Sequence, residues 1–222
     1  MTISALNTSQ IIYIIAVSII VSFAVFCLIF FPLRHNYIKK KYVEYYYREI
    51  YKIAMANDYY LINQFAFKID DNSLLKIDHI LFGDKYVYII NDCYYEGDIV
   101  GKINDKSLIN LSKRGKKHYI DNPILLNRFL LTRLCMVTNL DPSIMIGITV
   151  VNDSCNCEIN SDSKQFYAIS RNKLSALIKA IESRPIDKLN AKALDKLVQS
   201  INKMNRRKKG NESSTPKSER HL

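Results

Sequence analysis

The sequence predicts an α/β fold, a mixed central sheet with flanking helices, preceded by one transmembrane helix. Three observations predict it. An uncharged apolar run fills residues 11–31, short β-branched or aromatic segments follow between residues 59 and 103, and helical and strand patterns alternate over 123–204. The 222 residues, 48% of them hydrophobic, suffice for one domain with a buried core and an appendage.

The apolar run, IIYIIAVSIIVSFAVFCLIFF at residues 11–31, has the length of a membrane span. As a helix it would be about 31 Å long, which matches the hydrocarbon core of a bilayer. A cleaved signal peptide would have basic residues before a shorter run, and a buried helix of a soluble domain would have a polar face. We therefore expect a transmembrane helix.

Basic residues follow this run, and none precedes it. Arg34 and Lys39–Lys41 lie in the juxtamembrane segment 32–41, whereas residues 1–10 contain no Lys or Arg. The positive-inside rule therefore predicts a cell-membrane protein with a short extracytoplasmic N-terminus and a cytoplasmic C-terminal domain. The same cations are placed to contact anionic lipid headgroups, although a topology signal alone would explain them equally well.

Residues 42–204 are expected to form one α/β domain. Apolar residues at three- and four-residue steps predict a helix over 37–57. Short apolar runs separated by turn residues then predict an antiparallel meander, and its strands are expected at 59–67, 74–83, 85–92 and 97–103. A polar loop, NDKSLINLSKRGKKHYIDNP, is expected next.

The second part of the domain begins at a helix over 124–140, for which Asn122 is a suitable N-cap and Pro123 a suitable first residue. The nearly continuous apolar run at 143–151 is typical of a strand covered on both faces. A further strand and two helices are expected at 165–170, 171–183 and 187–204. The tail 205–222 is polar and basic, so we expect it to be disordered.

The net charge of +11 points to an anionic partner, either nucleic acid or a lipid surface. The juxtamembrane segment and the tail contribute +4 each, which leaves +3 for residues 42–204. Within the domain, the loop KRGKKH could bind backbone phosphates, although such loops are often only solvated. Its candidate nucleic-acid-binding residues are Lys113, Arg114, Lys116 and Lys117.

The five cysteines form no paired framework, so reduced thiols are expected. Cys155 and Cys157 are too close for an unstrained disulfide and have no matching His or Cys pair for zinc.

Three patches of the domain resemble the nuclease-related domain (NERD) family, a branch of the PD-(D/E)xK nuclease fold. They are KIDHILFGDKYVYIIN, YYEGDIVG and DNPILLN, and the resemblance covers residue 44 to about residue 183. In the last patch, Leu126 stands where the family has glutamine. The resemblance implies a restriction-endonuclease-like sheet and the cleavage of DNA with bound Mg²⁺, in which carboxylates hold the metal and a lysine stabilises the developing charge.

Carried over by position, Asp78 matches the metal-binding aspartate of the family. Glu44 is the best candidate for the metal-binding acid of the first helix, and Glu49 is the next. The acid of the family's acid-x-lysine pair falls on Asn91 and its lysine on Cys93. An asparagine carbonyl can still coordinate a metal weakly, but a thiol supplies no fixed positive charge.

Simpler interpretations of the same residues remain open. Asp78 would also serve as an acceptor of backbone hydrogen bonds, His79 as a partly buried polar residue and Cys93 as a small apolar one. Asp92 should point away from Asn91, because successive residues of a strand face opposite ways. The tyrosines of EYYYREIYK could stack on bases or pack on the sheet and the membrane surface.

Three functions fit these observations. A non-catalytic, membrane-anchored module that binds nucleic acid or a partner protein is favoured, because the acid and the lysine are missing. The alternative is a Mg²⁺-dependent DNA nuclease with a rearranged active site. A structural membrane protein without a ligand is the third.

Overall fold

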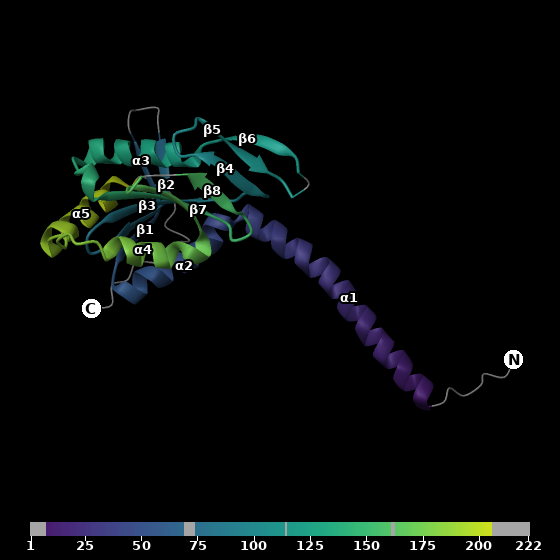
Figure 1. Cartoon of the computed structure of the whole chain (residues 1–222). Helices are drawn as coiled ribbons and strands as arrows, with labels where there is room; N and C mark the ends of the chain where they lie inside the picture. Colours follow the sequence, from purple (N-terminus) through teal and green to yellow (C-terminus); the bar gives the residue numbers. More distant parts are fainter. Residues whose placement is uncertain (1–7, 69–73, 114, 161–162, 206–222) are drawn as a thin grey trace. The chain divides into compact units, whose positions relative to one another are not determined.

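Figure 1 shows a computed structural model of the chain, which describes residues 8–68, 74–113, 115–160 and 163–205. The side chains of residues 8, 35, 38, 40, 43–45 and 160 lie outside the description. The chain divides into two units, residues 1–42 and 43–222, and each is described here by itself. The expected tail, residues 205–222, lies outside the described residues except for Asn205.

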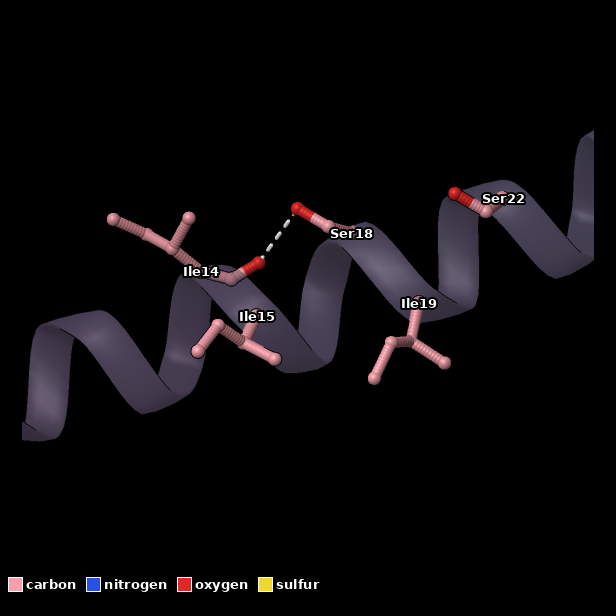
Figure 2. A pocket seen from close by; sticks show the side chains of 5 residues that line it. All are labelled: Ile14, Ile15, Ser18, Ile19 and Ser22. Carbon is pink, nitrogen blue, oxygen red and sulfur yellow. Dashed lines mark hydrogen bonds between the residues drawn. The ribbon is translucent and has the colours of Figure 1, made fainter.

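The first unit is built on helix α1 (Thr8–Lys40), which contains the apolar run. Ser9–Arg34 is long and apolar enough to cross a membrane, with a mean hydropathy of 3.0 over its most apolar window, and none of that window is buried. Ser18 donates a hydrogen bond to the carbonyl oxygen of Ile14 at 2.8 Å, so this hydroxyl is satisfied within the helix (Figure 2). Ser18 and Ser22 line a shallow hollow with three isoleucines.

The main sheet of the second unit is mixed, as the sequence predicts. Its strand order is β1-β2-β3-β7-β9. The first three strands pair antiparallel, and β3, β7 and β9 pair parallel. The strands are β1 (Tyr60–Lys68), β2 (Leu74–Phe82), β3 (Val87–Cys93), β7 (Met145–Val151) and β9 (Phe166–Ser170). Every residue of β7 is buried, which confirms the strand predicted from the continuous apolar run.

Helices cover both faces of this sheet (Figure 1). On one face, α3 (Pro123–Thr138) and α5 (Ala191–Met204) pack on a core that includes Val87 and Ile89 of β3. On the other face, α2 (Tyr42–Asn57) and α4 (Leu174–Glu182) pack on a core that includes Tyr88 and Ile90. Successive residues of β3 therefore enter different cores, which explains why its first four residues, Val87–Ile90, are all apolar.

The tyrosine-rich helix α2 packs on the sheet. Tyr46 is buried, and the Tyr47 ring stacks on His79 with 6.4 Å between ring centroids. The helix predicted over residues 37–57 is formed by the end of α1 and by α2, with only Lys41 between them outside a helix.

A second sheet, which the sequence did not predict, follows β3. Its strand order is β6-β5-β4-β8, and its strands are β4 (Asp98–Lys102), β5 (Ser107–Leu111), β6 (Lys117–Asp121) and β8 (Cys157–Asn160). The expected four-strand meander is therefore wrong in its last strand, and the expected polar loop contains β5 and β6. Leu108 and Ile120 face the small core of this sheet. Because one face is solvated, the polar side chains on it hide the strand pattern.

The starts of helices α3 and α4 differ in how they are capped. Asn122 caps α3 as predicted, because its side chain accepts a hydrogen bond from the Ile124 amide at 2.9 Å. Ser170, the residue before the predicted helix 171–183, makes no side-chain capping bond, and a 3₁₀ turn at Arg171–Lys173 precedes α4.

Candidate functional site

The residues that the family resemblance singles out meet where β2 and β3 lie side by side. The Asp78 amide donates a hydrogen bond to Asn91 Oδ1 at 3.3 Å, and Asp78 Oδ2 accepts one from the Asp92 amide at 3.0 Å. The structure thus brings Asp78 and Asn91 together. It also shows that the Asp78 carboxylate links the two strands through a backbone hydrogen bond.

Asp92 points to the opposite face of β3, as strand alternation predicts. Its Oδ2 lies 2.8 Å from Nε2 of His79, and Nδ1 of His79 lies 2.7 Å from Oδ1 of Asn63. The His79 and Asp92 side chains are only 1% and 0% exposed. Asp92 is therefore held by a buried partner and does not replace the missing acid.

Cys93 stands at the lysine position and is packed into the small core of the second sheet beside Tyr95 and Cys157. Burial raises the pKa of its thiol to about 12, and the nearby carboxylates of Asp78 and Asp92 act in the same direction. A hydrogen bond with Tyr95 opposes this shift but does not cancel it. At neutral pH the position therefore carries a neutral thiol and no cation.

Neither neighbouring lysine takes over this role. Lys85 donates from Nζ to the Arg184 carbonyl oxygen at 2.6 Å, and it lies in the turn before β3, whereas Asn91 lies near the other end of that strand. Lys102 is exposed at the end of β4, in the second sheet.

The acid expected from the first helix is not supplied by Glu49, which pairs with Lys52 at 3.0 Å on the surface of α2. Glu44 belongs to α2, but its side chain lies outside the described residues. Within the part of the chain that the structure describes, no three His, Cys, Asp or Glu side chains are grouped so that they could hold a metal ion.

The described residues do not fit the Mg²⁺ that the family resemblance implies. Mg²⁺ takes oxygen ligands and is usually held through one or two carboxylates. Asn91 turns its Oδ1 toward the Asp78 amide, and its Nδ2 is buried with no hydrogen-bond partner among the described residues. A buried N–H donor repels a cation, so the described donor set offers Asp78 and no second acid.

The lysine-rich segment forms the turn between β5 and β6. Lys113, Lys116 and Lys117 are exposed there, and Arg114 lies outside the described residues. Gly115 adopts a φ of +76°, and its amide donates to the Ser112 carbonyl oxygen at 2.8 Å. The lysines thus lie at the turn of a hydrogen-bonded hairpin. The sequence analysis predicted a loop for this segment and no hairpin.

Sequence reasoning also missed Tyr119, the fourth residue after Gly115. It lies on β6 and is 79% exposed. The apolar Ile120 between Tyr119 and Asp121 is the signal that would have placed this tyrosine on the opposite, solvent face of a strand.

The DNPILLN patch holds elements together. Asn122 Nδ2 donates to the carbonyl oxygens of Ile103 and Asp105 at 3.0 and 2.8 Å, and Asn127 Nδ2 donates to the Ile89 carbonyl oxygen at 3.2 Å. Leu126, at the family's glutamine position, is exposed.

The fold and these contacts define an α/β domain whose polar site lies at two adjacent strands of a mixed sheet. A family model described as "Nuclease-related domain" matches residues 32–151, more than half of the chain. The chain therefore belongs to the nuclease-related domain (NERD) family.

Among solved structures, the chain is similar to the crystal structure of a protein of unknown function, AF1548. The two share 8% sequence identity over 70% of this chain and 78% of the other, with a TM-score of 0.36. No curated protein matches the sequence.

Proposed function

We propose that this chain is a membrane-anchored NERD protein whose cytoplasmic domain binds nucleic acid without cleaving it. The observation that carries the proposal is the pair of residues at the acid and lysine positions. Asn91 uses its amide oxygen to hold Asp78, and Cys93 is a half-buried thiol whose pKa is raised to about 12 by desolvation. Losing one preorganised electrostatic contact costs about 10²–10³ in rate, and losing a metal carboxylate adds to that loss.

Binding requires only basic groups that reach phosphate oxygens, and the domain keeps them. Residues 102–119 contain six Lys or Arg and one Asp, a net charge of +5. The remainder of residues 42–204 contains 16 basic and 18 acidic residues, a net charge of −2. The positive charge of the domain is thus concentrated around the β5–β6 hairpin, which favours phosphate binding there.

Membrane anchoring is supported by the length and composition of α1. We propose that it spans the membrane once, with the domain on the cytoplasmic side and Arg34 and Lys39–Lys41 near anionic headgroups. Fusion of green fluorescent protein to the C-terminus should give fluorescent cells, and fusion of alkaline phosphatase should give inactive enzyme. Active phosphatase fusions would reverse the orientation.

The function is tested with the full chain in lipid nanodiscs, together with its Asp78→Ala variant. We expect no cleavage of labelled DNA by the wild type above the Asp78→Ala background, with Mg²⁺ or Mn²⁺ present. DNA binding should persist in EDTA and weaken as salt rises, because phosphate contacts release counterions. Metal-dependent cleavage that disappears in Asp78→Ala would establish the nuclease instead.

The binding site is tested by a triple variant, Lys113→Gln, Lys116→Gln and Lys117→Gln. Its matched control removes the same charge from exposed lysines of α5, with Lys192→Gln, Lys196→Gln and Lys203→Gln. Only the hairpin variant should weaken binding and reduce the salt dependence. Equal losses in both variants would indicate a general charge effect, and no DNA binding by the wild type would leave a partner protein as the ligand.

A further inference from the structure

Tyr119 stands on the solvent face of the second sheet. It pairs with Ile109 of β5, and the next pair, Leu108 and Ile120, faces the small core on the other side. Strand β6 is an edge of the sheet, and the Tyr119 side chain is largely exposed. A ring in this position contributes little buried area to the fold, although its face is available to a ligand.

Exposed basic side chains lie on the same hairpin as this ring. Lys117 lies two residues before Tyr119, so both side chains leave the same face of β6, about 7 Å apart along the strand. Lys113 and Lys116 are exposed at the adjoining turn. The solvent face of β5 behind the ring carries Ile109 and Leu111, which are only half-buried. An exposed aromatic ring on an apolar strand surface with cations at its border is suited to bases and phosphates together.

We infer that this face of the β5–β6 hairpin binds single-stranded nucleic acid, with a base stacked on Tyr119 and phosphates on Lys113, Lys116 and Lys117. The inference rests on the proposed nucleic-acid binding and defines which nucleic acid is bound. In a duplex, the base faces are covered by neighbouring base pairs, so a tyrosine on a sheet reaches none of them. An unpaired base offers its face to the ring, whereas duplex would be held by the lysines alone.

Three variants of the full chain in nanodiscs test the inference. They are Tyr119→Ala, Tyr119→Phe and, as a matched exposed tyrosine of α2, Tyr51→Ala. Affinities are measured by anisotropy for a labelled oligothymidylate and for a duplex of equal length. Tyr119→Ala should weaken oligothymidylate binding about tenfold and leave duplex binding unchanged, since stacking acts only on the unpaired base. Tyr119→Phe should retain the wild-type affinity, because the ring remains, and Tyr51→Ala should also be unchanged.

The chain contains no tryptophan, so Tyr119→Trp provides a single fluorescent reporter at the site. Oligothymidylate should quench this fluorophore by stacking on it, and duplex should not. Unchanged oligothymidylate affinity in Tyr119→Ala, or equal losses for both nucleic acids, would overturn the inference.

The outcomes separate this inference from the function on which it rests. If the triple lysine variant weakens the binding of both nucleic acids and Tyr119→Ala weakens the binding of neither, the proposed phosphate binding is supported and the inferred base stacking is wrong. If the wild type binds no nucleic acid, both fall. Displacement of the oligothymidylate by an acidic peptide that pairs with the free edge of β6 would also overturn the inference, in favour of a protein ligand.

Discussion

His79 and Asp92 face each other across β2 and β3, with 2.8 Å between Nε2 and Oδ2, and both side chains are buried. This pair fixes the direction in which the Asp92 carboxylate, next to Asn91 in the chain, points. A one-residue displacement of β3 would bring Asp92 to the position of the missing acid, but it would also break the contact with His79 and reverse the faces of Tyr88 and Ile90. The pair therefore fixes the register that leaves an amide at the acid position.

Removal of one partner of this pair should destabilise the domain. In His79→Ala, the buried Asp92 carboxylate loses its partner, and we expect the free energy of unfolding to fall by about 3 kcal/mol. Urea unfolding followed by circular dichroism measures this change. Lys52→Ala, in the exposed pair with Glu49, is the control and should leave the unfolding midpoint unchanged. A midpoint in His79→Ala equal to that control would show that the pair does not hold the register.

Asn91→Asp should create a dependence on divalent cations that the wild type lacks. The new carboxylate would lie at the Asp78 backbone amide, which Asn91 Oδ1 now contacts, and a bound cation would relieve its repulsion with the Asp78 carboxylate. We expect a lower melting temperature than wild type in EDTA and a rise on addition of Mg²⁺, measured by differential scanning fluorimetry. The wild type should show no such rise, and a Mg²⁺ effect in the wild type that Asp78→Ala removes would contradict the proposed loss of the metal site.

Stability should fall in alkaline solution because of two half-buried thiols, Cys93 and Cys157. Burial raises the pKa of Cys93 and of Cys157 from 9.0 to about 12. The folded chain therefore holds these thiol protons more tightly than the unfolded chain. The resulting stabilisation is complete below pH 9 and is lost as the pH rises to about 12. The double variant Cys93→Ala, Cys157→Ala should show a shallower loss of unfolding free energy over this range. Cys27→Ala, outside the domain, serves as the control, and an equal slope in both variants would dismiss the thiols as the cause.

Gly97 should tolerate no side chain at the start of the second sheet. Its φ is +139°, and a Cβ there would lie 2.2 Å from the Leu111 carbonyl oxygen. We expect Gly97→Ala to cost about 3 kcal/mol, from backbone strain and from displacement of β5. Gly115→Ala is the matched control, because φ is also positive but no atom lies within 4 Å of the new Cβ. Its cost should be about 1 kcal/mol, and similar melting temperatures for the two variants would refute the close approach of Gly97 to β5.

The main sheet was predictable because its strands are apolar for simple reasons. The run that became β7 is buried on both faces, and Val87, Tyr88, Ile89 and Ile90 of β3 alternate between two cores. The second sheet was not predictable in the same way. Its core is small, β6 exposes most of its residues, and the apolar residues of β5, Leu108, Ile109 and Leu111, do not alternate strictly with polar ones.

The positions of the candidate site were predicted from motif order, but their contacts were not. The motif places Asp78 and Asn91 in neighbouring strands, whereas only the structure shows that Asn91 accepts a bond from the Asp78 amide. The buried partner of Asp92 is distant in sequence, because β2 and β3 run antiparallel, and no local pattern identifies it. Tyr119 was not singled out because β6, the strand that carries it, was not predicted.

Asn122, a residue of the DNPILLN motif, has a structural role. Through one side chain it joins the first turn of α3, which rests on the main sheet, to the segment that follows β4 of the second sheet. Both polar atoms of the Asn122 side-chain amide make hydrogen bonds that connect these parts of the domain. Part of a nuclease-family motif can thus be required for the fold. The structural role of such a motif should be tested before the motif is taken as a sign of activity.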